Sequence, residues 1–320
     1  MVYFGESNER AFREGLEDDA DFIPLLSAED EDNMRNEKIP DILPILPLRN
    51  TVLFPGVVIP ITVGRDKSIQ LIKDYNKGDK TIGVVAQKSD STEEPTAEDL
   101  YGVGTVAHII KMLRMPDGNT TIIIQGKKRF KIVEYVQTEP YHKAKVLAYD
   151  ESKPPKSDKE FQAIISNLKE TSVQIVKISP NIPSDAGFAI NNIDSPTFLV
   201  NFISSNMNAT TQDKQKMLEV VNLKERSLLV LENLNKEFQI LELRNQIQNK
   251  TKMDLDKQQR EYFLNQQIKT IQEELGGNNF EQEINGYLEK AQTKKWSDEV
   301  KEVFEKQIAK LQRMNPNAAE

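Results

Sequence analysis

Short apolar runs alternate with turn residues between positions 42 and 150. The run at 57–63 is rich in β-branched residues, which favour strands. Further strands are predicted at 81–87, 104–115, 120–125, 130–136 and 143–149. Helical spacing of apolar residues interrupts them only at 67–76, and Met-Pro-Asp-Gly-Asn at 115–119 predicts a tight hairpin turn. Strands this short predict a small β-barrel or sandwich, which we place at residues 41–150.

A helical pattern replaces the strands from residue 151 onward. Two prolines at 154–155 mark a linker, and Ser157-Asp158-Lys159-Glu160 then forms a capping box that opens a helix. That helix ends before Pro180. Ser195 followed by Pro196 is typical of a helix start, and a second helix is expected over 198–203. We therefore predict a compact helical subdomain at residues 151–210.

One very long helix is predicted over 211–277, because neither proline nor glycine occurs from Thr197 to Leu275. Thr210 or Thr211 can cap its start, and a Gly-Gly pair ends it. Its apolar residues form a first stripe at 217, 221, 228, 231, 234, 238 and 241, and a second at 262, 264, 268, 271 and 275. The part between, 244–261, is almost entirely polar. Two short helices, over 280–293 and 298–313, are expected to fold back on the second stripe.

Charge is concentrated at the N-terminus. The net charge is −8, and residues 1–38 hold 12 acids and 4 bases, which leaves 38 of each in residues 39–320. We predict an acidic disordered tail at residues 1–40. These acids argue against a mitochondrial transit peptide, and no signal-peptide core is visible, so a cytoplasmic protein is expected. No apolar run approaches the roughly 18 residues of a membrane span, so no membrane contact is expected.

The composition excludes several kinds of chemistry. The chain has no cysteine and only two histidines, His108 and His142, which excludes disulfides, thiolate nucleophiles and three-histidine metal sites. Gly126-Lys127-Lys128 lacks the upstream glycine and the Ser or Thr of a phosphate-binding loop. His108 lies among apolar strand residues and is interpreted as structural. A Ser–Lys dyad stays open, because both residues are common, but no catalytic, cofactor-binding or metal-binding residue is predicted.

A cluster of basic residues in the strand region allows a second interpretation. The cluster comprises Lys111, Arg114, Lys127, Lys128, Arg129, Lys131, Lys143 and Lys145. Phe130 and Tyr141 lie among them, as aromatic residues do in faces that bind nucleic acid. Charged outer faces that discourage edge pairing of strands give the same pattern. The alternative function is therefore a free-standing nucleic-acid-binding barrel with a coiled-coil dimerisation helix.

Two motifs some 200 residues apart resemble the Lon protease family. ILPLRNTVLFPG at 45–56, followed by PITVGRDKS at 60–68, resembles the opening of the family's amino-terminal domain. QREYFLNQQIKTIQEELG at 259–276 resembles the helix that precedes its ATPase module. The resemblance covers about residues 40–320 and leaves the acidic tail outside.

The resemblance implies a fold and an activity. The family's barrel is similar to PUA-like barrels, so the expected fold class is α+β: a small PUA-like β-barrel or sandwich, a helical subdomain and one very long helix. Two short helices at 278–320 would then lead to the ATPase module. The parent protein would be a bacterial ATP-dependent serine protease that uses ATP and magnesium, forms a homohexamer, and degrades misfolded, damaged and short-lived regulatory proteins.

The ATPase and protease motifs of the family have no matching residues in these 320. The chain alone is therefore expected to be inactive and without a cofactor, and to serve substrate recognition and assembly. The resemblance leaves weak DNA binding open.

Substrate contacts are predicted at two places in the β region. One is the corner that follows the 57–63 run, with Arg65, Asp66 and Lys67, and the other is the hairpin arm with Met112, Leu113 and Met115. The edges of a small β domain can hold an extended, unfolded chain by strand addition. The three apolar residues of the arm fit barrel core or hairpin packing equally well.

Overall fold

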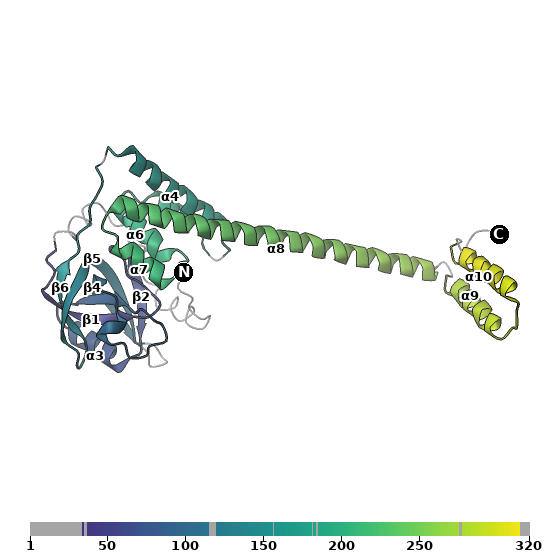
Figure 1. Cartoon of the computed structure of the whole chain (residues 1–320), viewed down its shortest axis with the longest axis horizontal. Coiled ribbons are helices and arrows are strands. Elements are labelled where there is room, and N and C mark those ends of the chain that lie inside the picture. Colours follow the sequence, from purple (N-terminus) through teal and green to yellow (C-terminus); the bar gives the residue numbers. More distant parts are fainter. Residues whose placement is uncertain are drawn as a thin grey trace. The chain divides into compact units, whose positions relative to one another are not determined.

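The computed structural model describes residues 34, 37–114, 120–155, 157–180, 182–183, 185–274 and 277–313 (Figure 1). The chain divides into two compact units, Met1–Arg244 and Asn245–Glu320. The predicted tail at 1–40 lies almost wholly outside the described residues, as does the hairpin turn at 115–119. Among the described residues, no helix is both long and apolar enough to cross a membrane.

The first unit contains a closed, mixed β-barrel. Its strands are β1 (Ile42–Leu48), β2 (Val58–Val63), β3 (Thr81–Ala86), β4 (Val103–Arg114), β5 (Thr120–Gln137) and β6 (Lys143–Ala148). They lie in the order β2-β5-β4-β3-β1-β6, and a further pairing of β5 with β6 closes the sheet. β1 and β3 run parallel, and the chain between them forms β2 and the helix α3 (Asp66–Tyr75).

The barrel closes because β5 changes partner along its length. Its first part pairs with β2, with Thr120 opposite Val63, and its second part pairs with β6, with Phe130 opposite Ala148. The prediction of two strands, 120–125 and 130–136, is corrected to this single strand. Gly126 lies where the partner changes, and a Cβ atom there would collide with the carbonyl oxygen of Phe54.

The barrel core is built around Phe130. Cβ atoms on Gly83 or Gly104 would come within 3.0 Å of the Phe130 Cζ atom, so the two glycines make room for the ring. β1 is a strand that the sequence pattern did not predict, because Pro44 and Pro47 interrupt its apolar run. The other predicted strands and the helix at 67–76 are confirmed within a few residues.

In the described part of the chain, a group of short and medium-length helices comes between the barrel and the helix α8 (Leu223–Glu274). They are α4 (Lys159–Ile178), α5 (Ala186–Asn191), α6 (Pro196–Asn206) and α7 (Thr211–Glu219), and one 3₁₀ turn, η1 (Ala97–Asp99), lies earlier in the chain. Ser195 caps α6 as predicted, since its side chain accepts a hydrogen bond from the Phe198 amide. The cap of α4 is Asp158 rather than Ser157, because the Asp158 carboxylate accepts from the Phe161 amide.

The long helix predicted over 211–277 is interrupted. α7 ends at Glu219, and α8 runs from Leu223 to Glu274. The linker residue Ser152 causes the break: its amide donates to the Val221 carbonyl (3.1 Å), and its carbonyl accepts from the Leu223 amide (2.9 Å). The Asn222 side chain then caps α8 by accepting from the Lys224 amide (2.9 Å). This interruption depends on a residue some seventy positions away, which a local pattern does not reveal.

The start of α8 belongs to the core of the first unit. Leu223, Val230 and Leu234 are buried against α4, α6 and α7, whereas Val221 and Leu228, predicted in the same stripe, are exposed. Beyond Arg244, every described side chain of α8 except Asn245 is exposed.

The second unit contains two short helices, α9 (Gly277–Gln292) and α10 (Asp298–Leu311). Ile284 is buried, and the rings of Trp296 and Phe304 lie edge to face with centroids 4.9 Å apart. The predicted second stripe of α8 is exposed at the described positions 262, 264, 268 and 271. The expectation that the two short helices cover this stripe is therefore not met in the described residues.

Candidate functional site

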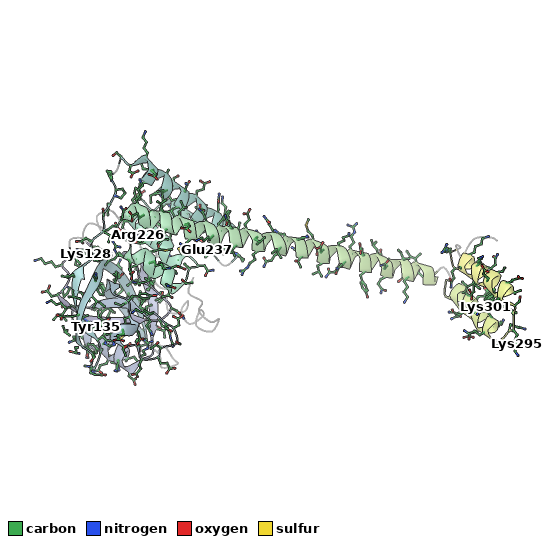
Figure 2. All side chains as sticks on the ribbon, viewed as in Figure 1. Lys128, Tyr135, Arg226, Glu237, Lys295 and Lys301 are labelled. Carbon is green, nitrogen blue, oxygen red and sulfur yellow. The ribbon has the colours of Figure 1, made fainter. Side chains whose placement is uncertain are left out.

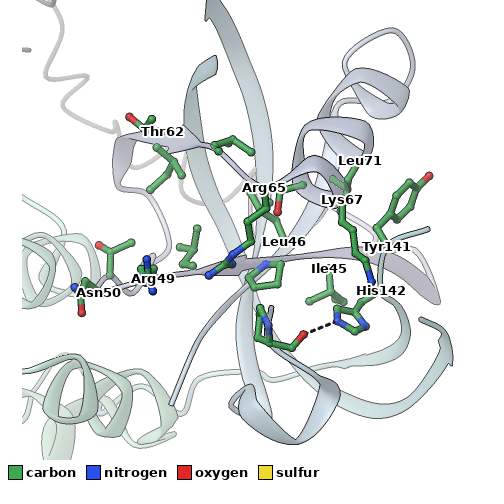
Figure 3. A pocket seen from close by; sticks show the side chains of 18 of the residues that line it. Ile45, Leu46, Arg49, Asn50, Thr62, Arg65, Lys67, Leu71, Tyr141 and His142 are labelled. Atoms are coloured by element: carbon green, nitrogen blue, oxygen red, sulfur yellow. Dashed lines mark hydrogen bonds between the residues drawn. The ribbon is translucent and has the colours of Figure 1, made fainter. Parts of the chain in front are cut away.

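A wide groove of about 1340 Å³ opens on one side of the barrel (Figure 3). We call it the edge groove; its lining comprises residues 45–51, 59–68, 71, 93–97, 138–139, 141–142, 205–209 and 214. These segments come from β1, β2, the β2–α3 corner, the helices α3, α6 and α7, and the loops that follow β1, β3, β5 and α6. All of them lie in the first unit.

The groove lies beside two incompletely paired strand edges. Among the described residues β2 pairs with β5 alone, so its other edge carries no strand. β1 pairs with β6 only through 42–44, and its last residues pair with β3 on the opposite edge. Pro60 and Pro47 have no amide to donate, which limits how many backbone bonds a further strand could make. On β1 the Ile45 amide already donates to the His142 carbonyl (2.8 Å), so the edge of β2 is the longer one open to an added strand among the described residues.

The predicted corner residues line this groove. Figure 3 shows Arg65 and Lys67 extending from the corner over the strand that carries Ile45 and Leu46. Arg65 Nη2 donates to the side-chain oxygen of the buried Gln87 (2.5 Å), and Lys67 Nζ lies 2.7 Å from the Glu139 carboxylate. Burial lowers the pKa of Arg65, and the neighbouring Arg49 lowers it further. The hydrogen bond to Glu139 raises the pKa of Lys67.

Asp66 lines the groove too, at the first position of α3. Its carboxylate there favours the helix, because the N-terminal end of a helix carries partial positive charge. The groove wall carries both signs of charge, with Arg49 and Lys214 among the bases and Glu93 and Glu94 among the acids.

Tyr141 and His142 form the wall beneath α3. The Tyr141 hydroxyl donates to the Asp74 carboxylate (3.1 Å), and burial together with this bond raises the pKa of Tyr141 to about 12. His142 Nε2 lies 3.0 Å from the Pro95 carbonyl oxygen. Both rings therefore have structural contacts that fix the wall. His108 lies on β4, outside the lining, and burial together with Lys127 lowers its pKa.

The second predicted contact region is not part of the groove. Met112 and Leu113 lie on β4 and are partly buried, and Met112 packs against the barrel core. Met115 lies outside the described residues. The position of Met112 agrees with the packing interpretation, and of the five predicted residues that the structure describes it brings Arg65, Asp66 and Lys67 together in the groove.

One member of the basic cluster is buried, and two others have partners within the barrel. Arg129 is buried at 3 % exposure, and its Nη1 atom donates to the Leu218 and Val220 carbonyls. Lys145 lies near Glu134, and Lys143 stacks over the Tyr141 ring. The free-standing nucleic-acid-binding barrel is therefore not supported. Among the described residues, no three His, Asp or Glu side chains are grouped as metal ligands would be.

Several groove residues escaped the sequence patterns. Arg49, Asn50, Lys214 and the 205–209 segment line it, yet they are up to 165 positions apart (214 minus 49). Arg49 and Asn50 lie within the first of the two family motifs, and that motif was the available signal. Asn50 adopts a positive φ of 56°, a conformation that asparagine tolerates better than most residues.

Comparisons with known proteins agree on one family. The family model described as "ATP-dependent protease La (LON) substrate-binding domain" matches residues 42–236. The chain is 55 % identical to the Lon protease of Flavobacterium johnsoniae over 303 residues, which cover 95 % of the chain and 37 % of that protein. It is 54 % identical to the Lon protease of Cytophaga hutchinsonii over 298 residues, with coverage of 93 % and 37 %. The chain thus spans less than two fifths of the length of these curated relatives.

The fold is also found among solved structures. The N-terminal domain of the Mycobacterium avium complex Lon protease aligns with a TM-score of 0.50 and 18 % identity, over 61 % of this chain and 98 % of that one. At this identity the likeness concerns the fold alone.

Proposed function

The chain belongs to the Lon protease family, and we propose that its first unit engages the polypeptide substrates of an ATP-dependent protease through the edge groove. The observation that carries this proposal is the groove beside two incompletely paired strand edges, lined by the β2–α3 corner. An extended chain can add to such an edge through its backbone, with side chains seated on either side.

The geometry of this edge favours unfolded over folded substrates. Strand addition needs a segment whose own amides and carbonyls are free, and a folded protein has already paired most of them. Backbone hydrogen bonds do not depend on the side chains of the substrate, so they favour no particular sequence. The groove wall carries both Arg65 and Glu94, so it favours neither acidic nor basic substrates. A broad range of misfolded and damaged proteins is the substrate class that this site fits.

A steric block at the edge tests the proposal. Thr62 is exposed on β2 within the groove, and Thr62→Trp places a large ring there. We expect binding of a labelled, reduced and unfolded polypeptide to weaken at least about fivefold, measured by fluorescence anisotropy. The matched control is Val133→Trp, which changes another exposed β-branched residue, on β5 outside the groove.

Two outcomes of this experiment would contradict the proposal. Weaker binding in Val133→Trp with unchanged binding in Thr62→Trp would place the site on β5, outside the edge groove. Equal affinity for the folded and unfolded forms of the same polypeptide would contradict strand addition.

The other activities expected from the family belong to the full-length protease, which we call the parent. We infer that the parent hydrolyses ATP with magnesium, cleaves proteins with a serine nucleophile, assembles as a homohexamer and works in the cytoplasm, as the family membership suggests. The 320-residue chain then contributes substrate binding and assembly. Purified alone, it should neither hydrolyse ATP nor cleave casein, and nucleotide-dependent cleavage by a clean preparation would contradict this division.

A further inference from the structure

A second, smaller cavity lies where the barrel meets the helical part of the first unit. It has a volume of about 100 Å³, and its lining includes Lys127, Lys128, Arg129, Lys153 and Asn201. One water needs about 10–15 Å³, so this cavity is large enough for a group of several heavy atoms. We propose that it binds a protonated oxyanion, of which hydrogen phosphate is the simplest.

Arg129 supplies the central positive charge. Its Nη1 atom is fully engaged, because it donates to the Leu218 carbonyl (2.8 Å) and to the Val220 carbonyl (2.9 Å) at the end of α7. The Tyr149 ring lies against its guanidinium, 5.4 Å from centroid to Cζ. The buried Nη2 atom has no hydrogen-bond partner within the part of the chain that the structure describes. A buried donor left in this state is costly, and an acceptor in the cavity would satisfy it.

The nearby carboxylate does not neutralise Arg129. Glu151 Oε2 accepts from Arg226, a fully buried residue of α8, and Glu151 Oε1 accepts from the Thr197 hydroxyl (3.1 Å). Arg129 Nη2 lies 3.9 Å from the same carboxylate, beyond hydrogen-bond distance. Two buried guanidinium groups thus share one carboxylate, which leaves an excess of one positive charge beside the cavity. Burial first, and then Arg226, lower the pKa of Arg129 to about 10, so it remains charged at neutral pH.

The mouth of the cavity adds to this positive charge. Lys127 and Lys128 come from β5, and Figure 2 labels Lys128 on the barrel and Arg226 on α8. Asp150, 75 % exposed, lies 3.8 Å from Lys128 and is largely solvated. The N-terminal end of α6, with Thr197 and Phe198, also lines the cavity and contributes its partial positive charge.

Asn201 specifies that the oxyanion carries a proton. Its Nδ2 atom donates to the Pro55 carbonyl (3.0 Å), which fixes the orientation of the amide. Its buried Oδ1 atom then has no donor among the described residues, although Asn201 lines the cavity. A phosphate that retains one proton at neutral pH can accept from Arg129 and donate to Asn201 at once. Sulfate, which has the same shape but no proton at this pH, cannot donate.

The site would connect three parts of the first unit. Arg129 belongs to β5 and Asn201 to α6. The two carbonyl groups that accept hydrogen bonds from Arg129 lie at the end of α7. A ligand that binds the folded chain and not the unfolded one raises the midpoint of thermal unfolding according to its affinity. Phosphate should therefore stabilise the junction between the barrel and the helices.

The test measures thermal unfolding of the 320-residue chain at pH 7 and constant ionic strength, with phosphate, sulfate or chloride. We expect a saturable rise in the midpoint with phosphate, at least about fivefold weaker affinity for sulfate, and no saturable effect of chloride. Isothermal titration calorimetry gives the stoichiometry, which should be one.

Two variants separate the site from general charge effects. Lys127→Gln with Lys128→Gln changes only the mouth, and Asn201→Asp replaces the acceptor by an anion that repels the ligand. Both should weaken phosphate binding at least about fivefold, whereas Lys73→Gln, on the exposed face of α3, should leave it unchanged. The proposal is overturned if chloride reproduces the phosphate effect. It is also overturned if the mouth variant, which disturbs no buried contact, binds phosphate as the parent chain does.

Discussion

The two ends of the helix α8 differ in burial although both carry large apolar residues. Near its start Leu223, Val230 and Leu234 are buried, together with the charged Arg226. Toward its end Tyr262, Phe263 and Ile268 are each more than half exposed. Apolar spacing is present in both places, so spacing alone does not decide burial.

The difference follows from what each end contacts. The first turns face a core formed by α4, α6 and α7, and the Asp158 carboxylate of the α4 cap bonds Lys224 of α8 (2.8 Å). The described residues of α8 after Arg244 are exposed apart from Asn245, and i,i+4 contacts such as that between Tyr262 and Gln266 lie on the helix itself. Packing against other elements supplies most of a helix's stability in proteins, so the two ends should differ in stability as well as in exposure.

The largest expected difference is in hydrogen exchange. Amides at 223–241 should open only with the first unit, while those at 244–261 open by local unfolding with a far smaller free energy. We expect exchange rates, corrected for sequence, to differ by roughly a thousandfold or more in a monomeric chain, measured by hydrogen–deuterium exchange and mass spectrometry. Equal protection of the two segments would mean that the middle of α8 packs on a surface not yet identified.

The next largest effect concerns the buried ion pair at the start of α8. Arg226→Ala leaves Glu151 in a buried site without its closest cation, and we expect the free energy of unfolding to fall by about 3–5 kcal/mol. Urea denaturation followed by far-ultraviolet circular dichroism measures this. The single tryptophan, Trp296, lies in the second unit and would not report it.

The matched control for that variant is Arg260→Ala, which removes an exposed arginine near the other end of the helix. It should change the free energy of unfolding by less than about 0.5 kcal/mol. A loss below about 1 kcal/mol in Arg226→Ala would show that Arg129, 3.9 Å from the same carboxylate, takes over the pairing.

Much of the fold could be predicted from local patterns. The β-branched runs gave four of the six strands, and the Ser195-Pro196 pair gave the start of α6, because strand and cap preferences act over a few residues. The strand β1 and the interruption before α8 could not be predicted this way. Two prolines interrupt the apolar pattern of β1. The interruption before α8 depends on hydrogen bonds with Ser152, which is distant in sequence.

The candidate site could be predicted only in part. The short motif at 60–68 was enough to predict Arg65, Asp66 and Lys67, because these three residues lie in one corner of the chain. The rest of the lining comes from segments around 95, 140 and 207, which only the folded barrel and its helices bring together. The unsatisfied Arg129 and Asn201 were also invisible in the sequence, since Arg129 appeared there as one member of a basic surface cluster.

A smaller effect is expected from removing one apolar side chain in the buried start of α8 or in its exposed middle. Leu234→Ala leaves a cavity in the core of the first unit and should lower the free energy of unfolding by about 2–3 kcal/mol. Leu255→Ala, at a position that is 53 % exposed, should change it by less than about 0.5 kcal/mol. If the two variants lose similar stability under the same urea denaturation, the distal part of α8 is packed in solution.

The smallest expected loss of stability, and the one that depends most on pH, is that of the Asp158→Asn variant. The hydrogen bond of Asp158 with Lys224, and then its capping bond from the Phe161 amide, lower the pKa of this carboxyl in the folded chain. A lowered folded pKa means that the stabilisation is fully present above the unfolded value of about 3.9 and is lost as the pH falls through the folded value. Asp158→Asn keeps a side-chain acceptor for the helix cap but removes the charge that attracts Lys224.

The Asp158→Asn variant should therefore be slightly less stable than the parent chain at pH 7 and equally stable once the pH is well below 4, where the parent's carboxyl is protonated. The measurement is the midpoint of urea denaturation by circular dichroism between pH 2 and pH 7. Glu302→Gln, which removes the exposed pair with Lys306 in the second unit, should leave the profile of the first unit unchanged. A stability difference between Asp158→Asn and the parent that stays constant over this pH range would show that the contact with Lys224 contributes through packing and hydrogen bonding, because a contribution from charge must vanish with the charge.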